Sequence, residues 1–149
     1  MSVINMARNL KQVHPDFVML YAVGTFYQSF GKDAYIVSYN MGYKIRAAKG
    51  SIPTVGFPKN AISKVKAKLE REKINFMLLD TRNNYDVDEV SDNGNLNRYD
   101  EILKTAHRTV SVRRRLDDAF HELVKRSANE DVRPQIEQIE RIAYENRKV

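Results

Sequence analysis

Residues 17–24 read FVMLYAVG, a continuous apolar run that ends at a glycine. The length of this run and its β-branched and aromatic content predict a buried strand. Residues 75–80, NFMLLD, form a second run of this kind and predict a second buried strand. Before each run lies a segment with apolar residues at helical spacing, which predicts helices over residues 4–13 and 61–72. Strands that alternate with helices indicate an α/β fold for residues 1–80.

The segments between these elements carry weaker patterns. Residues 25–34 are predicted as a short helix, because Phe26, Phe30 and Ala34 fall four residues apart. Residues 43–47 alternate in polarity and predict a strand, followed by a turn at residues 49–51. Asn60 is expected to cap the helix that begins after it.

The sequence changes character after residue 80. Residues 81–97 are polar and rich in turn-forming residues, which predicts a linker or a surface loop. Apolar residues then recur at helical spacing, predicting one helix over about residues 99–125, or two that break near Thr109, and another after Pro134. We therefore expect a domain over residues 1–80, a linker over residues 81–97 and a two-helix appendage over residues 98–149. These helices must fold back, pair together or meet another chain, because neither can bury its apolar face alone.

Charge is distributed unevenly along the 149 residues, whose formal net charge is +6. Residues 1–80 hold 12 Lys and Arg against five Asp and Glu, a net charge of +7. An excess of positive charge in one part of a chain favours a partner that carries phosphates.

The composition argues against several classes of protein. The chain has no cysteine, which excludes disulfides, cysteine-based zinc sites and thiol nucleophiles, and fits a reducing compartment. No apolar run is long enough to span a membrane, and the N-terminus has no signal-peptide pattern. We expect a cytoplasmic protein without a membrane partner.

Catalytic and cofactor motifs are missing from the sequence. The three histidines, His14, His107 and His121, do not fall at zinc-binding spacing, and neither a phosphate-binding P-loop nor a nucleophile-elbow motif occurs. The sequence therefore predicts a protein that is not an enzyme and has no metal and no cofactor. A nuclease built from Asp16 and Asp80, both near predicted strand ends, stays open as a third alternative.

Residues 21–34, YAVGTFYQSFGKDA, resemble the N-terminal mismatch-recognition domain of the DNA mismatch repair family MutS. That family reads Y-x-x-G-D-F-Y-E-x-F-x-x-D-A at this place, and His14-Pro15 matches its upstream HP. Residues 52–61, IPTVGFPKNA, resemble its IPMAGIPYHA segment. The resemblance covers about residues 10–80 and implies a mixed-sheet α/β module that approaches DNA from the minor groove.

The resemblance also implies roles for individual residues. Phe26 matches the phenylalanine that wedges beside a mispaired base, although its spacing would equally suit a core aromatic. Gln28 stands where the family has a base-contacting glutamate, and Thr25 replaces an aspartate. Gln28 can still hydrogen-bond a base but lacks the charge, so we expect binding to survive and mismatch discrimination to weaken.

Basic residues are the candidates for phosphate contacts. Lys59, Lys64 and Lys68 flank the predicted site, and Arg113, Arg114 and Arg115 form a run within the predicted long helix. For both groups a solvated helix face is the alternative interpretation.

Two functional hypotheses follow. The first is a non-catalytic module that binds double-stranded DNA, mismatched or distorted, as an accessory to a larger repair or mobile-element machine. RNA stays an open variant of this hypothesis, because stacking and phosphate contacts do not distinguish the two nucleic acids. The second is an interaction module that has lost mismatch readout and forms a homo-oligomer, or docks on a partner enzyme, through its C-terminal helices.

Overall fold

Strand β1 (Val18–Val23) lies at the centre of a five-stranded sheet with the order β3-β2-β1-β4-β5. It pairs in parallel with β4 (Phe76–Asp80) and antiparallel with β2 (Phe26–Phe30). The edge strands β3 (Thr54–Pro58) and β5 (Asp86–Ser91) are both antiparallel to their neighbours. The computed structural model describes residues 2–47 and 51–145.

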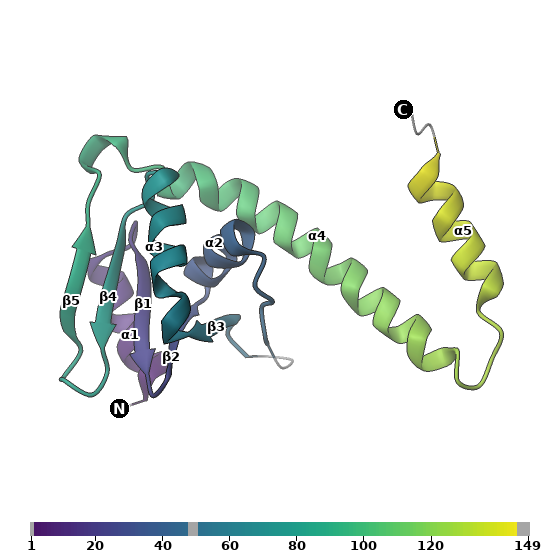
Figure 1. Cartoon of the computed structure of the whole chain (residues 1–149), viewed down its shortest axis with the longest axis horizontal. Coiled ribbons are helices and arrows are strands. Elements are labelled where there is room, and N and C mark those ends of the chain that lie inside the picture. The colour runs from purple at the N-terminus through teal and green to yellow at the C-terminus, as the bar shows by residue number, and fades with distance from the viewer. Residues whose placement is uncertain (1, 48–50, 146–149) are drawn as a thin grey trace. The chain divides into compact units, whose positions relative to one another are not determined.

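Both faces of the sheet are covered by helices, because the central strands carry apolar residues on both sides. On one face Val18 and Leu20 pack against α2 (Lys32–Met41) and α3 (Ile62–Arg71). On the other face Met19 and Tyr21 pack against α1 (Val3–Val13). Figure 1 shows α2 and α3 on the near side of the sheet and α1 behind it. The α/β prediction is confirmed, as are the helix over residues 4–13 and the two buried strands.

Residues 26–30 form strand β2, so the helix predicted over residues 25–34 is wrong for its first half. β2 pairs along its whole length with β3 and, over residues 26–28, with β1. Helix α2 begins only at Lys32. Backbone pairing to two neighbouring strands outweighs the weak helical spacing of three side chains.

Residues 86–91 form β5, so the segment predicted as a linker or loop contains a strand. β5 pairs with β4 and also contributes Glu89, which accepts a hydrogen bond from Lys66 of α3 at 2.8 Å. Most of its side chains are exposed, because an edge strand needs only its backbone to join a sheet. A short 3₁₀ turn, Gly94–Leu96, then leads into the next helix.

Helix α4 (Tyr99–Arg126) is continuous, without a break at Thr109. Its first turns bury Tyr99, Ile102 and Ala106 against the α2–α3 side of the core. The chain forms two compact units, residues 1–110 and residues 111–149. The second unit holds the rest of α4 and helix α5 (Arg133–Tyr144). This division differs from the boundaries at residues 80 and 98 that the sequence suggests.

Three predictions about short segments were wrong or fall mostly outside the described residues. Residues 43–47 form no strand; Arg46 alone makes an isolated antiparallel bridge to Thr54. Asn60 does not cap α3, because it lies within a 3₁₀ turn (Lys59–Ala61) that leads into the helix. The turn predicted at residues 49–51 falls mostly outside the described residues. Among the described residues, no helix has the length and apolar character that a membrane span requires.

Candidate nucleic-acid interface

The tip of the β1–β2 hairpin presents an aromatic side chain to solvent. Gly24 and Thr25 form the turn, and Gly24 has a φ of 61°, a left-handed conformation that favours glycine. Phe26 is the first residue of β2 and is 47% exposed. Tyr27 points to the opposite face, where its ring lies 5.8 Å from that of Phe57 in a stacked arrangement. Period-two alternation therefore exposes Phe26 while its neighbour anchors the strand.

Gln28 lies on the same face as Phe26, two residues further along the strand. Its cross-strand partner on β3 is Gly56, which is exposed and has no side chain to cover it. Pro58, opposite Phe26, is also exposed. We call the surface made by Phe26, Gln28, Gly56 and Pro58 the open β2–β3 face. α1 packs over β1 and β4 and reaches Phe30 at the far end of β2, whereas Phe26, Gly56 and Pro58 are exposed.

Cationic residues lie at both ends of the open β2–β3 face. The Lys59 backbone N–H donates to the carbonyl of Thr25 at 3.0 Å, which fixes Lys59 beside the hairpin tip. At the other end Arg46 exchanges two backbone hydrogen bonds with Thr54, at 2.8 and 2.9 Å. Because bridged residues share a face, the exposed Arg46 belongs to the same side as Phe26 and Gln28. Sequence reasoning missed Arg46, since only the bridge reveals its neighbours.

The remaining predicted basic residues are not on this face. Lys64 and Lys68 belong to α3, which packs on the opposite face of the sheet. Lys68 Nζ lies 3.5 Å from the Glu72 carboxylate, which also receives Arg98 at 3.2 Å. Arg113, Arg114 and Arg115 belong to the second unit rather than to the unit that carries Phe26. Of the eight predicted residues, the structure thus brings together Phe26, Gln28 and Lys59.

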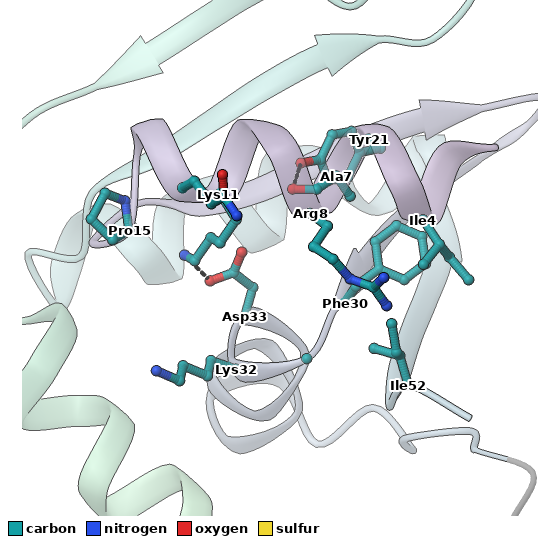
Figure 2. Close-up of a pocket in the computed structure, with 12 residues that line it drawn as sticks. Ile4, Ala7, Arg8, Lys11, Pro15, Tyr21, Phe30, Lys32, Asp33 and Ile52 are labelled. Carbon is teal, nitrogen blue, oxygen red and sulfur yellow. Dashed lines mark hydrogen bonds and ion pairs between the residues drawn. The ribbon is translucent and has the colours of Figure 1, made fainter. Parts of the chain in front are cut away.

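Beside the interface an ion pair joins the partly buried Lys11 of α1 to the buried Asp33 of α2 (Figure 2). Lys11 Nζ donates to Asp33 Oδ1 at 2.6 Å, to the Phe17 carbonyl at 2.6 Å and to the Tyr99 hydroxyl at 3.0 Å. Asp33 also accepts from the Tyr99 hydroxyl at 2.6 Å and from the Met19 backbone N–H at 3.1 Å. Every donor of the ammonium group therefore has an acceptor. Asp33 is one of the residues through which the sequence resembles MutS, but its burial was not foreseen.

Burial away from water is the largest influence on the pKa values of these groups. Burial raises the pKa of the Asp33 carboxyl and lowers the pKa of the Lys11 ammonium, and their mutual attraction opposes both shifts. The pKa of the Tyr99 hydroxyl is strongly raised by burial and then by the nearby Asp33 charge. Such a fully hydrogen-bonded buried pair is typical of a structural element that fixes the position of helices.

A cavity of about 340 Å³ opens where the open β2–β3 face ends, between α1 and the start of α2. Phe30, Tyr21 and Ile52 contribute much of its apolar wall. Figure 2 shows Arg8 extending from α1 toward Phe30 and Ile52, with the Lys11–Asp33 pair further along α1. Phe30 shares the strand face of Phe26, so the cavity continues the same surface.

The geometry argues against the nuclease alternative. Asp80 pairs in register with Ala22 near the end of β1, whereas Asp16 precedes the start of that strand. The two carboxylates therefore lie at opposite ends of the β1–β4 ladder and cannot share a metal ion. Among the residues that the structure describes, no three His, Asp or Glu side chains form a group suited to a metal.

Comparisons with known proteins agree with the α/β fold. The chain is 38% identical over 66 residues to the DNA mismatch repair protein MutS of Porphyromonas gingivalis. The aligned stretch covers 42% of this chain and 7% of the relative. It is 37% identical over 60 residues to the DNA mismatch repair protein MutS of Chlorobium chlorochromatii, covering 40% of this chain and again 7% of the relative. The matches thus span less than a tenth of the length of these curated relatives. A family model described as MutS domain I matches residues 3–91, up to the last residue of β5. The chain therefore belongs to the MutS domain I family.

Proposed function

We propose that this chain is a non-catalytic module that binds mismatched or otherwise distorted double-stranded DNA and inserts Phe26 at a weakened base step. We further propose that it serves as an accessory to a larger repair or mobile-element machine. The observation that carries the proposal is the 47% exposure of Phe26 at the tip of a hairpin whose second strand is paired on both sides.

A side chain that wedges between bases must be exposed, and its backbone must be held rigidly. Phe26 pairs in register with Val23 on one side and Pro58 on the other, so its backbone is held within the sheet. An aromatic ring gains about 1–3 kcal/mol by stacking on a base. Unstacking a base step costs a few kcal/mol and least at a mismatch, so such a wedge selects weakened steps.

Gln28 is the candidate for contact with the displaced base. Its amide lies on the face of Phe26, and the neighbouring Gly56 leaves room for a ligand to approach. An amide donates and accepts, so it can bond a base edge of either kind. A carboxylate only accepts, and beside phosphates it adds repulsion, so the two residue types would discriminate mismatches differently.

Phosphate contacts would come from the cations at the two ends of the open β2–β3 face. Lys59 lies beside the tip, and Thr54, the bridge partner of Arg46, lies five residues from Lys59 along the extended chain, or about 17 Å. That span equals about five nucleotides of one strand. The net charge of +7 over residues 1–80 supports the same partner.

Fluorescence anisotropy tests the proposal directly. The labelled duplexes are a matched one, one with a G·T mismatch and one with a single-base bulge, each at two salt concentrations. Wild type should bind the bulge most tightly. Phe26→Ala should lose about 1–3 kcal/mol on the bulge, or about 5- to 150-fold in Kd, and little on the matched duplex.

Tyr39→Ala is the matched control, because Tyr39 is another exposed aromatic of the first unit but lies on α2. It should bind every duplex as wild type does. Binding that is equal for all duplexes and indifferent to Phe26→Ala would refute the wedge and leave a backbone binder. Failure of wild type to bind any duplex at low salt would refute DNA binding altogether.

A further inference from the structure

The second unit exposes a row of apolar side chains along α4. The row consists of Val112, Leu116, Phe120 and Val124, each four residues from the next. Their exposed fractions lie between 42% and 68%, although side chains of this kind are normally buried. On α4 itself they follow directly after Val110, the last residue of the helix that is buried.

Helix α5 adds a second apolar surface to the same unit. Ile136, Ile142 and Tyr144 are each exposed by 44% or more. A groove of about 290 Å³ lies between the two helices, and its lining is almost entirely apolar, including Phe120, Val124, Val132, Ile136 and Ile139. The unit therefore offers both a ridge and a groove to a partner.

The exposed apolar area is what a stable dimer needs. Seven side chains of about 150 Å² each, roughly half exposed, leave on the order of 500 Å² of apolar surface. An interface of standard size takes about 800 Å² from each partner, of which about 60% is apolar, or on the order of 500 Å². We propose that a second copy of this chain covers this surface, so that the protein is a dimer through α4 and α5.

The spacing of the row fits a copy of itself. Side chains exactly four residues apart form the inclined ridge that packs against an equal ridge on another helix. The row is also symmetric about residue 118, so an antiparallel pairing sets Leu116 against Phe120 of the second copy and Val112 against Val124. Such a contact is made twice across a two-fold axis, as in an isologous interface.

Charge favours the antiparallel over the parallel arrangement. Arg113, Arg114 and Arg115 precede the centre of the row, whereas Asp117, Asp118 and Glu122 lie near it or follow it. An antiparallel pair about residue 118 sets Arg114 of one copy opposite Glu122 of the other. A parallel pair would set three arginines toward three arginines, which opposes association.

Dimerisation does not rest on DNA binding and can be measured without DNA. Sedimentation velocity of the full chain should show a dimer that dissociates on dilution. Leu116→Asp should shift the protein to monomer, with at least a tenfold weaker dimer and an unchanged circular dichroism spectrum. Leu96→Asp is the control, because Leu96 is 64% exposed but belongs to the first unit, and it should leave the dimer intact.

Cross-linking tests the register, because the chain has no cysteine of its own. Under oxidation, an equimolar mixture of Leu116→Cys and Phe120→Cys should give a covalent dimer of the two variants. Leu116→Cys alone should give far less. Wild type that stays monomeric at high protein concentration, or a dimer that survives Leu116→Asp, would overturn the proposal, and efficient cross-linking of Leu116→Cys with itself would overturn the antiparallel arrangement.

Discussion

Replacing Asp33 by asparagine should destabilise the first unit severely. The carboxyl is 3% exposed and accepts hydrogen bonds from Lys11, Tyr99 and the Met19 N–H. In Asp33→Asn the partly buried Lys11 ammonium loses its counter-charge, and the new amide cannot accept at both of the old oxygen positions. Breaking a buried pair by removing one partner costs about 3–5 kcal/mol. That is a large part of the 5–15 kcal/mol by which a typical domain is stable, and corresponds to a fall in Tm of about 10–20 °C.

Urea denaturation followed by circular dichroism measures this cost. The double variant Lys11→Met, Asp33→Asn removes the unpaired ammonium as well and should recover part of the loss. Asp88→Asn is the matched control, because Asp88 is exposed on β5 and its replacement should leave the midpoint unchanged. The reasoning fails if Asp33→Asn behaves like Asp88→Asn, or if the double variant is less stable than Asp33→Asn alone.

Three further predictions concern pH, base readout and phosphates. Burial raises the pKa of Tyr21 and of Tyr99 well above the ordinary tyrosine value of 10.0, so these tyrosines ionise first in the unfolded chain. Stability should therefore fall above pH 10, by about 1.4 kcal/mol per pH unit for each of the two residues. Lys11, whose pKa is lowered, acts in the opposite direction only below its unfolded value of 10.5, and Tyr21→Phe should reduce the alkaline slope measured by urea denaturation at several pH values. Gln28→Glu should sharpen discrimination between mismatched and matched duplexes in anisotropy; unchanged discrimination would contradict a role in readout. Lys59→Ala should lower the slope of log K against log salt by about 0.9, the value for one phosphate contact, and an unaltered slope would exclude that contact.

The sequence predicted those elements whose burial is complete on one or both faces. β1 and β4 are continuous apolar runs because both of their faces meet helices, and α1 and α3 keep apolar residues at helical spacing. β2 was predicted as a helix for a definite reason. A spacing of four residues, as between Phe26 and Phe30, satisfies the helical period approximately and the strand period of two, so pairing partners alone distinguish them. β5 was not predicted from the sequence, because an edge strand with exposed, charged side chains shows no alternation of apolar and polar residues.

The candidate site was found from the sequence in part, through the resemblance of residues 21–34 to MutS. The resemblance pointed to Phe26 and Gln28, and period-two alternation then sets both on one face of β2. It could not point to Arg46 or reveal that Gln28 lies opposite Gly56, because these residues meet only through the pairing of β3 with its neighbours. The lysines of α3 share the positive sequence region but lie on the other face of the sheet.

What the sequence by itself determined is the α/β class and the two buried strands. These are local properties, since periodicity and apolar runs depend only on residues that lie close together in the sequence. The tertiary structure alone decided which charges become partners. Lys11, Asp33 and Tyr99 are separated by up to 88 residues, yet they form one hydrogen-bonded cluster because the sheet order brings α1, α2 and α4 together. Long-range pairing of this kind is set by burial and loop closure, which no local pattern encodes.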